Sequence, residues 1–470
     1  MNKDNILLVN PPQSFKHKFG EERNYVPPLG LLYLNEYLNR DGFNSALIDM
    51  DAEEYTLDDI YKLIEERNVN VVGISVFTRT RRIPYYLSGK IKERYPNIYL
   101  MLGGAHCTVA PEDVQNNNNA DVIVRGEAEL DICGIVAKKE KGIVECNSPT
   151  NLNELYKPRR DIDYINRDYG MLLNMKFSKA ATAVSSSRGC PFKCTFCTRV
   201  GLMKFRYRTP EDVVEEIKQL YDQGYDGIIF NDDNFTTIPE RAMRIAELIK
   251  KEKLKMDFAF QGMPIQDEEF WRTMSSANFC VVCTGIEHIK PEIIRYFNKY
   301  PRPEEWKDRI AKTLRMINKY NILTCGSFIL GAPMETRQDA KDLIDFLCEH
   351  KVDLKNGNEL LFAYGTQLWK DAVKEGLFPS NVLHIKSSEV FPEKKEYLRE
   401  MFDLAWRKTT SGFPRVLKKI ATCNKNDKIT PIFSLFKWVL QAKKSFFTDG
   451  PAQGYGRKKE SRLEDEGITN

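Results

Sequence analysis

A short loop with three cysteines constrains this chain more than any other feature of its sequence. Cys190, Cys194 and Cys197 follow the spacing C-x3-C-x2-C within the stretch 187–201. One loop with this spacing can wrap three thiolates around an iron-sulfur cluster, and a [4Fe-4S] cluster needs four ligands. Without a fourth cysteine nearby, one iron stays open to a small molecule, which favours catalysis over plain electron transfer. We expect Phe196, between the last two cysteines, to shield one face of the cluster.

A structural zinc site is the alternative for the same loop, because three cysteines and a histidine can hold zinc tetrahedrally. The loop contains no histidine, and the other closely spaced cysteines are Cys280 and Cys283. These two lie in an apolar stretch with strand character, where residues three apart point to opposite faces. We therefore expect both to be buried as small hydrophobic residues, and we expect a core position for Cys325 as well.

The cysteine triad and the segments after it resemble those of the radical S-adenosylmethionine (SAM) enzymes. In that family the open iron chelates the amino and carboxylate groups of SAM, so the resemblance makes the three cysteines both metal ligands and catalytic residues. It implies that Asp232 and Asp233, which directly follow an apolar strand, accept hydrogen bonds from the methionine amine. It also implies that Gln261 and Glu287 accept from ribose hydroxyls or the amine, and that Ile329 contacts the adenine.

The first 140 residues alternate short apolar segments with segments of helical periodicity. This alternation predicts an α/β fold with a doubly wound parallel sheet, whose ligands bind beyond the carboxyl ends of the strands. The predicted strands are Ile6–Pro12, Ser45–Met50, Val69–Val76, Ile98–Leu102 and Asp121–Val124.

Polar and glycine residues follow three of these strands. Glycine lets a backbone approach a bulky ligand, although loops after strands also use glycine for purely structural reasons. The segments 26–34, 103–106 and 124–129 resemble the Rossmann-like cobalamin-binding domain of the class B radical SAM enzymes. The resemblance implies that the residues at these strand ends contact cobalamin: Thr78, Arg79, Gly103, Gly104, Gly126 and Glu127.

The sequence does not identify the residue that would be the lower ligand of the cobalt. Many cobalamin domains place a histidine in the motif D-x-H-x-x-G, and this chain offers His17 without the aspartate that would orient it. We expect His17 to be a solvated loop residue. His106 is the other candidate, and we expect it to hydrogen-bond to the nucleotide tail or to backbone.

The second half of the chain alternates strands and helices again, after a polar linker over 141–176. About six βα units fit into 177–375, fewer than the eight of a closed barrel, so we predict an open, partial (β/α)6 TIM-type barrel. Its active site lies at the carboxyl ends of the strands. The predicted strands are 177–186, Gly227–Phe230, Asp257–Phe260, Cys280–Thr284, Leu323–Leu330 and Asn358–Phe362.

The C-terminal region, 376–447, is predicted to be helical, with helices at Glu396–Thr410, Phe413–Thr422 and Pro431–Phe447. The last of these carries many apolar and aromatic residues, with lysines near its end. Either it packs on the barrel as a lid, or it lies on a membrane surface. The residues 448–470 are polar and predict a disordered tail.

The composition suits two or three domains of an intracellular protein. The chain has 470 residues, 42% of them hydrophobic, and a net charge of +4, which gives no indication of a nucleic-acid partner. Its 11 cysteines are unevenly spaced, which favours reduced thiols in the cytoplasm, and the N-terminus shows no signal-peptide pattern. We also expect an anaerobic or low-oxygen host, because oxygen damages exposed clusters.

The resemblance implies an enzyme that methylates an unactivated carbon. A 5'-deoxyadenosyl radical would abstract a substrate hydrogen, methylcobalamin would donate the methyl group, and flavodoxin or ferredoxin would supply electrons. The substrate is a small or lipophilic molecule. One alternative is a cobalamin-dependent oxidative cyclase or rearrangement enzyme, and a second is a sensor that holds cobalamin and a cluster without catalysis.

Overall fold

The computed structural model describes residues 4–12, 27–53, 55–160, 171–172, 175–176, 178–198 and 203–423. The chain divides into two compact units, and the boundary between them lies between Met171 and Leu172. Within the described ranges, no helix has the length and apolar character needed to cross a bilayer. His17, the helix predicted at 431–447 and the tail at 448–470 lie outside the described residues.

The first unit contains a six-stranded sheet with the strand order β2-β1-β3-β4-β5-β6. All neighbouring strands in it are parallel. Its strands are β1 (Asn5–Asn10), β2 (Asn44–Asp49), β3 (Val71–Ser75), β4 (Tyr99–Gly103), β5 (Val122–Arg125) and β6 (Gly142–Glu145). Its helices are α1 (Leu29–Arg40), α2 (Met50–Glu53), α3 (Leu57–Glu66), α4 (Arg82–Arg94), α5 (Ala105–Val109), α6 (Pro111–Asn117) and α7 (Ile132–Lys138).

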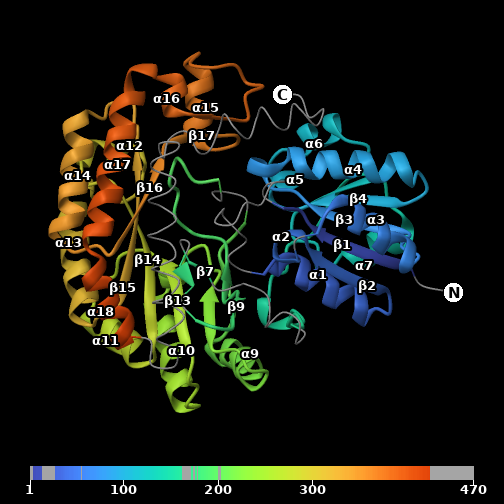
Figure 1. The fold of residues 1–470 in the computed structure, drawn as a ribbon, viewed down its shortest axis with the longest axis horizontal. Coiled ribbons are helices and arrows are strands. Elements are labelled where there is room, and N and C mark those ends of the chain that lie inside the picture. Colours follow the sequence, from blue (N-terminus) through green and yellow to red (C-terminus); the bar gives the residue numbers. More distant parts are fainter. Residues whose placement is uncertain are drawn as a thin grey trace. The chain divides into compact units, whose positions relative to one another are not determined.

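Helices cover both faces of this sheet, which confirms the doubly wound fold. Along β1 the side chains alternate, so Leu7 and Val9 face one side while Ile6 and Leu8 face the other. The first pair packs in a core with residues of α3 and α4. The second pair packs in a separate core with residues of α1 and α7. Figure 1 shows α4 and α1 on opposite sides of the strands.

The first unit reaches further along the chain than residue 140. β6 pairs in parallel with β5, and Val122 lies opposite Gly142. This strand falls in the segment that the sequence suggests as a linker. Its four residues alternate between partly buried and exposed, as expected for an edge strand. A strand this short and with little apolar character looks like a loop in the sequence.

The second unit contains another six-stranded sheet, with the order β16-β15-β14-β13-β12-β9. Its strands are β9 (Ala181–Val184), β12 (Gly227–Phe230), β13 (Asp257–Gly262), β14 (Phe279–Glu287), β15 (Leu323–Leu330) and β16 (Leu354–Glu359). Its longer helices are α9 (Pro210–Asp222), α10 (Pro239–Lys251), α11 (Glu268–Ser276), α13 (Pro303–Lys319), α14 (Arg337–Glu349), α17 (Lys395–Ser411) and α18 (Phe413–Cys423).

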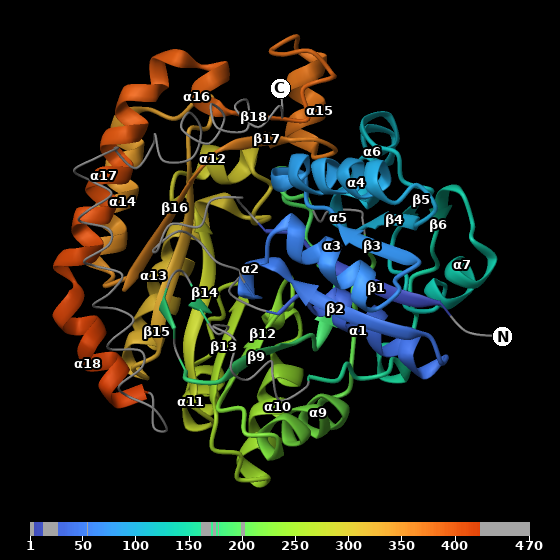
Figure 2. The same ribbon diagram turned by 45° about the vertical axis from the view of Figure 1, so that its right-hand side comes forward.

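Each strand of this sheet lies beside the one that precedes it in this series, and all pairs are parallel. Such a singly wound sheet places its connecting helices on one outer face, as in a TIM barrel. Figure 2 shows α13, α14 and α17 along that face. The two edge strands, β16 and β9, are not paired with each other among the described residues, so the barrel is open, as predicted.

The helix boundaries follow local capping signals. The Thr209 side chain accepts from the Asp212 backbone N–H at the start of α9, where Pro210 occupies the first turn. Thr336 and Asp339 form a reciprocal capping box at the start of α14. Both of the predicted C-terminal helices that fall within the described residues, α17 and α18, are present.

The last predicted strand, Asn358–Phe362, is wrong in its boundaries. The segment spans two strands, because β16 ends at Glu359 and β17 covers Leu361–Ala363. β16 belongs to the barrel sheet, whereas β17 pairs in an antiparallel ribbon with β18 (His384–Lys386). Leu360, between the two strands, is itself apolar and continues into β17, so hydropathy alone does not reveal the break.

Candidate active site

The cluster loop begins directly after β9, at the carboxyl edge of the barrel sheet. Two short strands, β10 (Ser187–Arg188) and β11 (Arg206–Tyr207), pair in an antiparallel manner and close the base of the loop. Gly189 sits between β10 and the first cysteine with a φ of +77°, and an added Cβ would lie 2.7 Å from the Lys204 carbonyl oxygen. Only glycine fits this position without a shift of the backbone.

The middle of the loop is clamped by segments that are far away in the sequence. The Thr195 N–H donates to the Phe297 carbonyl at 2.9 Å, and the Thr195 hydroxyl donates to the Tyr296 carbonyl at 2.8 Å. The Leu368 N–H donates to the Thr195 carbonyl at 3.1 Å. Phe196 packs edge-on against Phe297 with ring centroids 5.2 Å apart. These contacts hold the loop from both sides.

Asp232 anchors the start of the cluster loop from within the protein. Its carboxylate is fully buried and accepts from the Ser186 N–H at 2.7 Å, the Ser186 hydroxyl at 2.6 Å and the Ser187 hydroxyl at 2.5 Å. Burial raises the pKa of Asp232, while the two serines and Arg241 oppose that shift. The buried carboxylate thus positions the loop, and its predicted contact with the methionine amine remains a prediction.

Two buried arginines hold the same segment through its carbonyl oxygens. Arg241 donates to the Ser186 carbonyl at 2.5 Å and to the Arg208 carbonyl at 2.9 Å. Arg208 donates to the Ser185 carbonyl at 3.1 Å and forms an ion pair with Asp212 at 2.6 Å. Hydrogen bonds from charged donors are stronger than neutral ones, so the strand that delivers the cysteines is firmly fixed.

Asp233 and Gln261 lie at the same carboxyl edge. The half-buried Asp233 carboxylate accepts from the Gly189 N–H at 3.1 Å, next to the first cysteine. The exposed Gln261 side chain donates through its amide nitrogen to the Asp232 carbonyl at 2.8 Å. Their predicted contacts with SAM remain predictions.

Glu287 forms a buried ion pair with Lys299. The Lys299 Nζ lies 2.9 Å from the Glu287 Oε1, and the two side chains are only 7% and 9% exposed. An added Cβ on Gly285 would lie 2.4 Å from that carboxylate, so the glycine makes room for the pair. Glu287 thus neutralises a buried lysine, and this role stands beside its predicted contact with ribose.

The three thiols share one polar environment that includes this lysine. Burial raises the pKa of Cys194 to about 11, and the positive charge of Lys299 opposes the rise. Burial also raises the pKa of Cys190. Iron must therefore displace protons from these thiols when it binds.

Three thiolates are a donor set that suits an iron-sulfur cluster. Within the described ranges, no three His, Cys, Asp or Glu side chains lie close enough together to hold one metal ion. A [4Fe-4S] cluster binds each thiolate on a different iron and so needs a wider arrangement. The triad would hold such a cluster, with the half-buried Phe196 beside it.

Ile329 lies at the end of β15, with its side chain 9% exposed in a hydrophobic cluster that includes Phe297 and touches Phe196. The turn after it is fixed by Glu335, whose carboxylate accepts from the Gly331 N–H at 2.9 Å. Burial raises the pKa of Glu335 to about 7. Burial also lowers the pKa of the neighbouring His288 to about 4. The predicted contact of Ile329 with adenine remains a prediction.

The cysteines of the barrel strands differ from expectation in one respect. Cys280 and Cys325 are buried, with 2% and 1% of their surface exposed. Cys283 is only half-buried, and it lies directly opposite Cys325 on the neighbouring strand, within hydrogen-bonding reach of its thiol. The expectation that Cys283 is a buried core residue is therefore wrong.

In the first unit, the predicted cobalamin residues come together at one edge of the sheet. The ends of β3 and β4 are adjacent, because Ser75 pairs with Gly103. Gly104 and Gly126 are exposed there, with φ values of +105° and +97°. Each is also packed on backbone, since an added Cβ would lie 3.1 Å from a carbonyl oxygen of Val76 or Cys146. These two glycines therefore have a structural role whatever binds above them.

This edge fits a large flat ligand. Phe77 follows β3 with 51% of its surface exposed, and a bare aromatic ring beside exposed glycine backbone suits one face of a macrocycle. Thr78, Arg79 and Glu127 lie in the same loops. This set would hold the corrin ring, and the individual contacts remain predictions.

His106 cannot serve as the lower cobalt ligand in this arrangement. It is fully buried, and its Nδ1 lies 3.1 Å from the Thr78 hydroxyl while its Nε2 lies 3.0 Å from Asp113. Tyr85 donates to the same carboxylate at 2.9 Å. The partners of His106 are thus side chains of its own unit, rather than the nucleotide tail or backbone suggested by the sequence.

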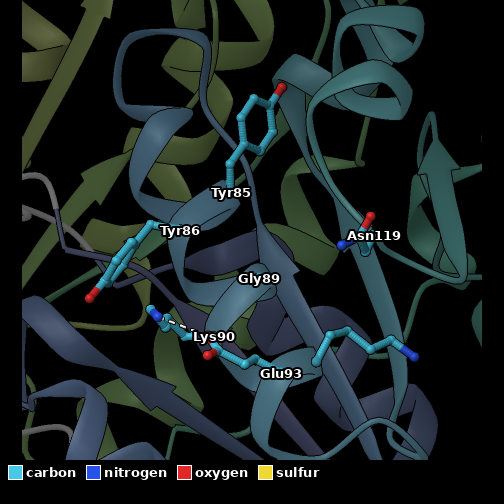
Figure 3. A pocket seen from close by; sticks show the side chains of 7 residues that line it. Tyr85, Tyr86, Gly89, Lys90, Glu93 and Asn119 are labelled. Atoms are coloured by element: carbon cyan, nitrogen blue, oxygen red, sulfur yellow. Dashed lines mark hydrogen bonds and ion pairs between the residues drawn. The ribbon is translucent and has the colours of Figure 1, made fainter. Parts of the chain in front are cut away.

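A pocket of about 500 Å³ opens beside α4 in the same unit (Figure 3). It is lined by α4 residues and by Asn119, and the ion pair of Lys90 with Glu93, 2.8 Å apart, lies at its wall. None of the predicted cobalamin residues lines it. We therefore do not assign cobalamin to this pocket.

Sequence reasoning missed the residues that support the site. Lys299, Arg241 and Thr195 carry no motif of their own, and each acts on a segment distant in the chain. The spacing of the cysteines indicates the ligands, but the partners that orient a ligand loop are set by tertiary contacts.

Comparisons with known proteins agree with this architecture. The model of the Radical SAM superfamily matches residues 184–347, and that of the B12 binding domain matches residues 20–136. An uncharacterized methyltransferase of Pyrococcus horikoshii is 31% identical over 438 residues, which cover 88% of this chain and 94% of that relative. The anaerobic magnesium-protoporphyrin IX monomethyl ester cyclase of Rubrivivax gelatinosus is 24% identical over 384 residues, covering 75% of this chain and 67% of the cyclase.

Among solved structures, the radical SAM methyltransferase TsrM of Kitasatospora setae has the same fold, with a TM-score of 0.65 and 16% identity, over 79% of this chain and 76% of TsrM. A six-stranded barrel with a cysteine-triad loop, on one chain with a B12-binding domain, defines a class of enzyme. This chain belongs to the cobalamin-binding, class B radical SAM family. The cofactors of that family are a [4Fe-4S] cluster, SAM and cobalamin.

Proposed function

We propose that this enzyme transfers a methyl group to an unactivated carbon of a small molecule. The observation that carries the proposal is the clamped cysteine loop at the carboxyl edge of the barrel sheet, on a chain that also has a B12-binding domain. The relative from Pyrococcus horikoshii is similar to this chain over nearly its whole length and is named as a methyltransferase. That name supports the same reaction.

The groups that bind here supply the difficult chemistry: reductive cleavage of SAM to a 5'-deoxyadenosyl radical, and a methyl group carried on the corrinoid. The protein has three tasks. The clamp at Thr195 and the anchor at Asp232 hold the cysteines in place. Phe196 and the hydrophobic cluster around Ile329 exclude water from one side. The Lys299–Glu287 pair places a compensated positive charge near the thiolates.

A second candidate is an oxidative cyclase or rearrangement enzyme without methyl transfer. The similarity to the Rubrivivax cyclase over 75% of this chain favours it. A sensor that binds both groups without turnover would have no need for an open iron, so we rank it below both enzymes. In either enzyme an external reductant such as flavodoxin or ferredoxin supplies electrons. Contact with a membrane remains a prediction, because the helix at 431–447 lies outside the described residues.

The test is anaerobic incubation of the reconstituted enzyme with a strong reductant, SAM with a deuterated methyl group, and small-molecule extract of the host. Methyl transfer predicts 5'-deoxyadenosine together with a product heavier by one deuterated methyl group. A cyclase would release 5'-deoxyadenosine without labelled product. A sensor would release neither, and that result would refute the proposal.

A further inference from the structure

The two faces of the barrel sheet carry different side chains. On the outward face, Phe328 of β15 stacks on Phe402 of α17 with ring centroids 6.5 Å apart. Gly326 lies two residues before Phe328 and so on the same face, where an added Cβ would lie 2.8 Å from Val352. Because side chains alternate along a strand, Ser327 lies on the opposite, inward face.

The sheet register brings four polar inward positions together. Cys283 of β14 lies opposite Cys325 of β15, and Ser327 of β15 lies opposite Asn356 of β16. The Asn358 amide is oriented toward the Ser327 hydroxyl, 3.5 Å away. We name Cys283, Ser327, Asn356 and Asn358 the inner polar patch.

The inner polar patch is accessible, although it lies on the strands of a six-stranded sheet. Asn358 is exposed, and the other three members are half-buried. The outward residue Phe328, between these positions on β15, is fully buried. Inward positions that served only the core would be apolar and buried. A ligand can therefore reach this part of the inner face.

The patch contains no carboxylate, ammonium or guanidinium side chain. The charged residues of the same strands are engaged elsewhere. The Lys355 ammonium donates to the Val352 carbonyl at 2.9 Å, and the Glu359 carboxylate accepts from the Ser388 N–H at 2.6 Å. Glu287 is neutralised by its lysine partner. The patch thus offers two amides, a hydroxyl and a thiol, which include both donors and acceptors.

We propose that the inner polar patch binds the substrate, and that the substrate is an uncharged polar small molecule with both hydrogen-bond donors and acceptors. The proposal rests on the proposed function and names its substrate class. A hydrocarbon tail would cover the amides of Asn356 and Asn358 without giving them partners, which costs affinity. An ionised substrate would be buried here without an opposite charge.

The experiment uses the holoenzyme and SAM with a radioactive methyl group. One incubation contains heat-treated, filtered cell extract, and the other contains detergent-solubilised lipids of the same cells. The products are partitioned between chloroform and water, and the aqueous phase is passed over a cation exchanger and an anion exchanger at neutral pH. The proposal predicts a labelled product in the aqueous phase that passes through both resins and that chromatography separates from labelled methionine and methylthioadenosine, which also form without extract. Unreacted SAM stays on the cation exchanger.

Two outcomes overturn the substrate class while leaving the proposed function intact: label in the chloroform phase, or labelled product retained by either resin. If 5'-deoxyadenosine forms and no phase contains labelled product, the proposed methyl transfer itself fails and the inference falls with it. The two failures are therefore distinguishable.

Two variants test the patch residues directly. Asn356→Asp and Asn358→Asp keep the side-chain size but add a negative charge that an uncharged substrate cannot compensate. Each is expected to lower the ratio of methylated product to 5'-deoxyadenosine at least tenfold. Asn381→Asp, in an exposed turn of the same unit, is the matched control and should leave the ratio unchanged.

An unchanged ratio in both patch variants would refute the assignment. If Asn356→Asp proves unstable in thermal unfolding, the exposed Asn358 carries the test alone, because a charge at an exposed position does not disturb the core. A purely structural role would lower the unfolding temperature and leave the product ratio intact, and that result would also refute it.

Discussion

Replacing Lys299 by Met should destabilise the barrel unit strongly, because it leaves Glu287 without its partner. The two side chains are 7% and 9% exposed, and their charged atoms lie 2.9 Å apart. Removing one member of a buried pair typically costs about 3–5 kcal/mol, since the remaining charge stays buried and uncompensated. For a domain of this size such a loss lowers the unfolding midpoint by something on the order of 10 °C. Glu287→Gln should have a similar effect.

The double variant Lys299→Met with Glu287→Gln separates this cause from a simple loss of packing. Neutral groups of similar size replace both charges, so most of the lost stability should return, with a coupling free energy of about 2 kcal/mol or more. The assay is thermal unfolding of the cluster-free chain, followed by circular dichroism under reducing conditions. If the stability loss of the double variant equalled the sum of the two single losses, the reasoning would be refuted.

A matched control lies on α14 of the same unit. Lys341 and Asp345 are 2.8 Å apart, but their side chains are 51% and 50% exposed. Water screens such a pair, so Lys341→Met and Asp345→Asn should combine additively and shift the unfolding midpoint only slightly. Equal coupling at both pairs would show that burial is not the cause.

Three further predictions follow from single contacts. Mild peroxide should join Cys283 to Cys325 in a disulfide, detected by peptide mass spectrometry as a cross-link that a Cys283→Ser variant lacks; free thiols at both positions would contradict it. The Co(II) form of the cobalamin-loaded enzyme should show the same electron paramagnetic resonance spectrum in the wild type and in His106→Ala, and nitrogen splitting lost in the variant would contradict the assignment. Because burial raises the pKa of Glu335 to about 7 in the folded protein, the stability it contributes is present at low pH and is lost as pH rises through that value. The unfolding temperature of a Glu335→Gln variant should therefore change less between pH 5 and pH 8 than that of the wild type. An equal change in both proteins would contradict this.

Periodic, apolar elements could be predicted from the sequence because their own residues specify them. β15 is predicted at Leu323–Leu330 and β12 at Gly227–Phe230, and both strands are found with these bounds. The start of β16 could not be recognised, because the run from Lys355 to Glu359 is polar and becomes a strand through its pairing with β15. For the same reason the accessibility of Cys283 was misjudged, since strand character alone does not say which face of a sheet is covered.

In the candidate site, the metal ligands could be predicted from the sequence, whereas the residues that position them could not. Cysteine spacing indicates the metal ligands, because a cluster imposes its own geometry on a short loop. Asp232 was recognised as important, but its burial among the serines before the loop could not be read from its position after a strand. The clamp on Thr195 comes from residues about a hundred positions away, and only the folded chain brings them together.

The most direct test of the central claim is electron paramagnetic resonance of the anaerobically reconstituted, reduced protein, combined with iron analysis. The account predicts about four irons per chain and a [4Fe-4S]⁺ signal that changes when SAM is added. A variant in which Cys190, Cys194 and Cys197 are all replaced by Ala should lose the iron, the signal and SAM cleavage. Stoichiometric iron in that variant, or a wild-type signal unaffected by SAM, would contradict the account.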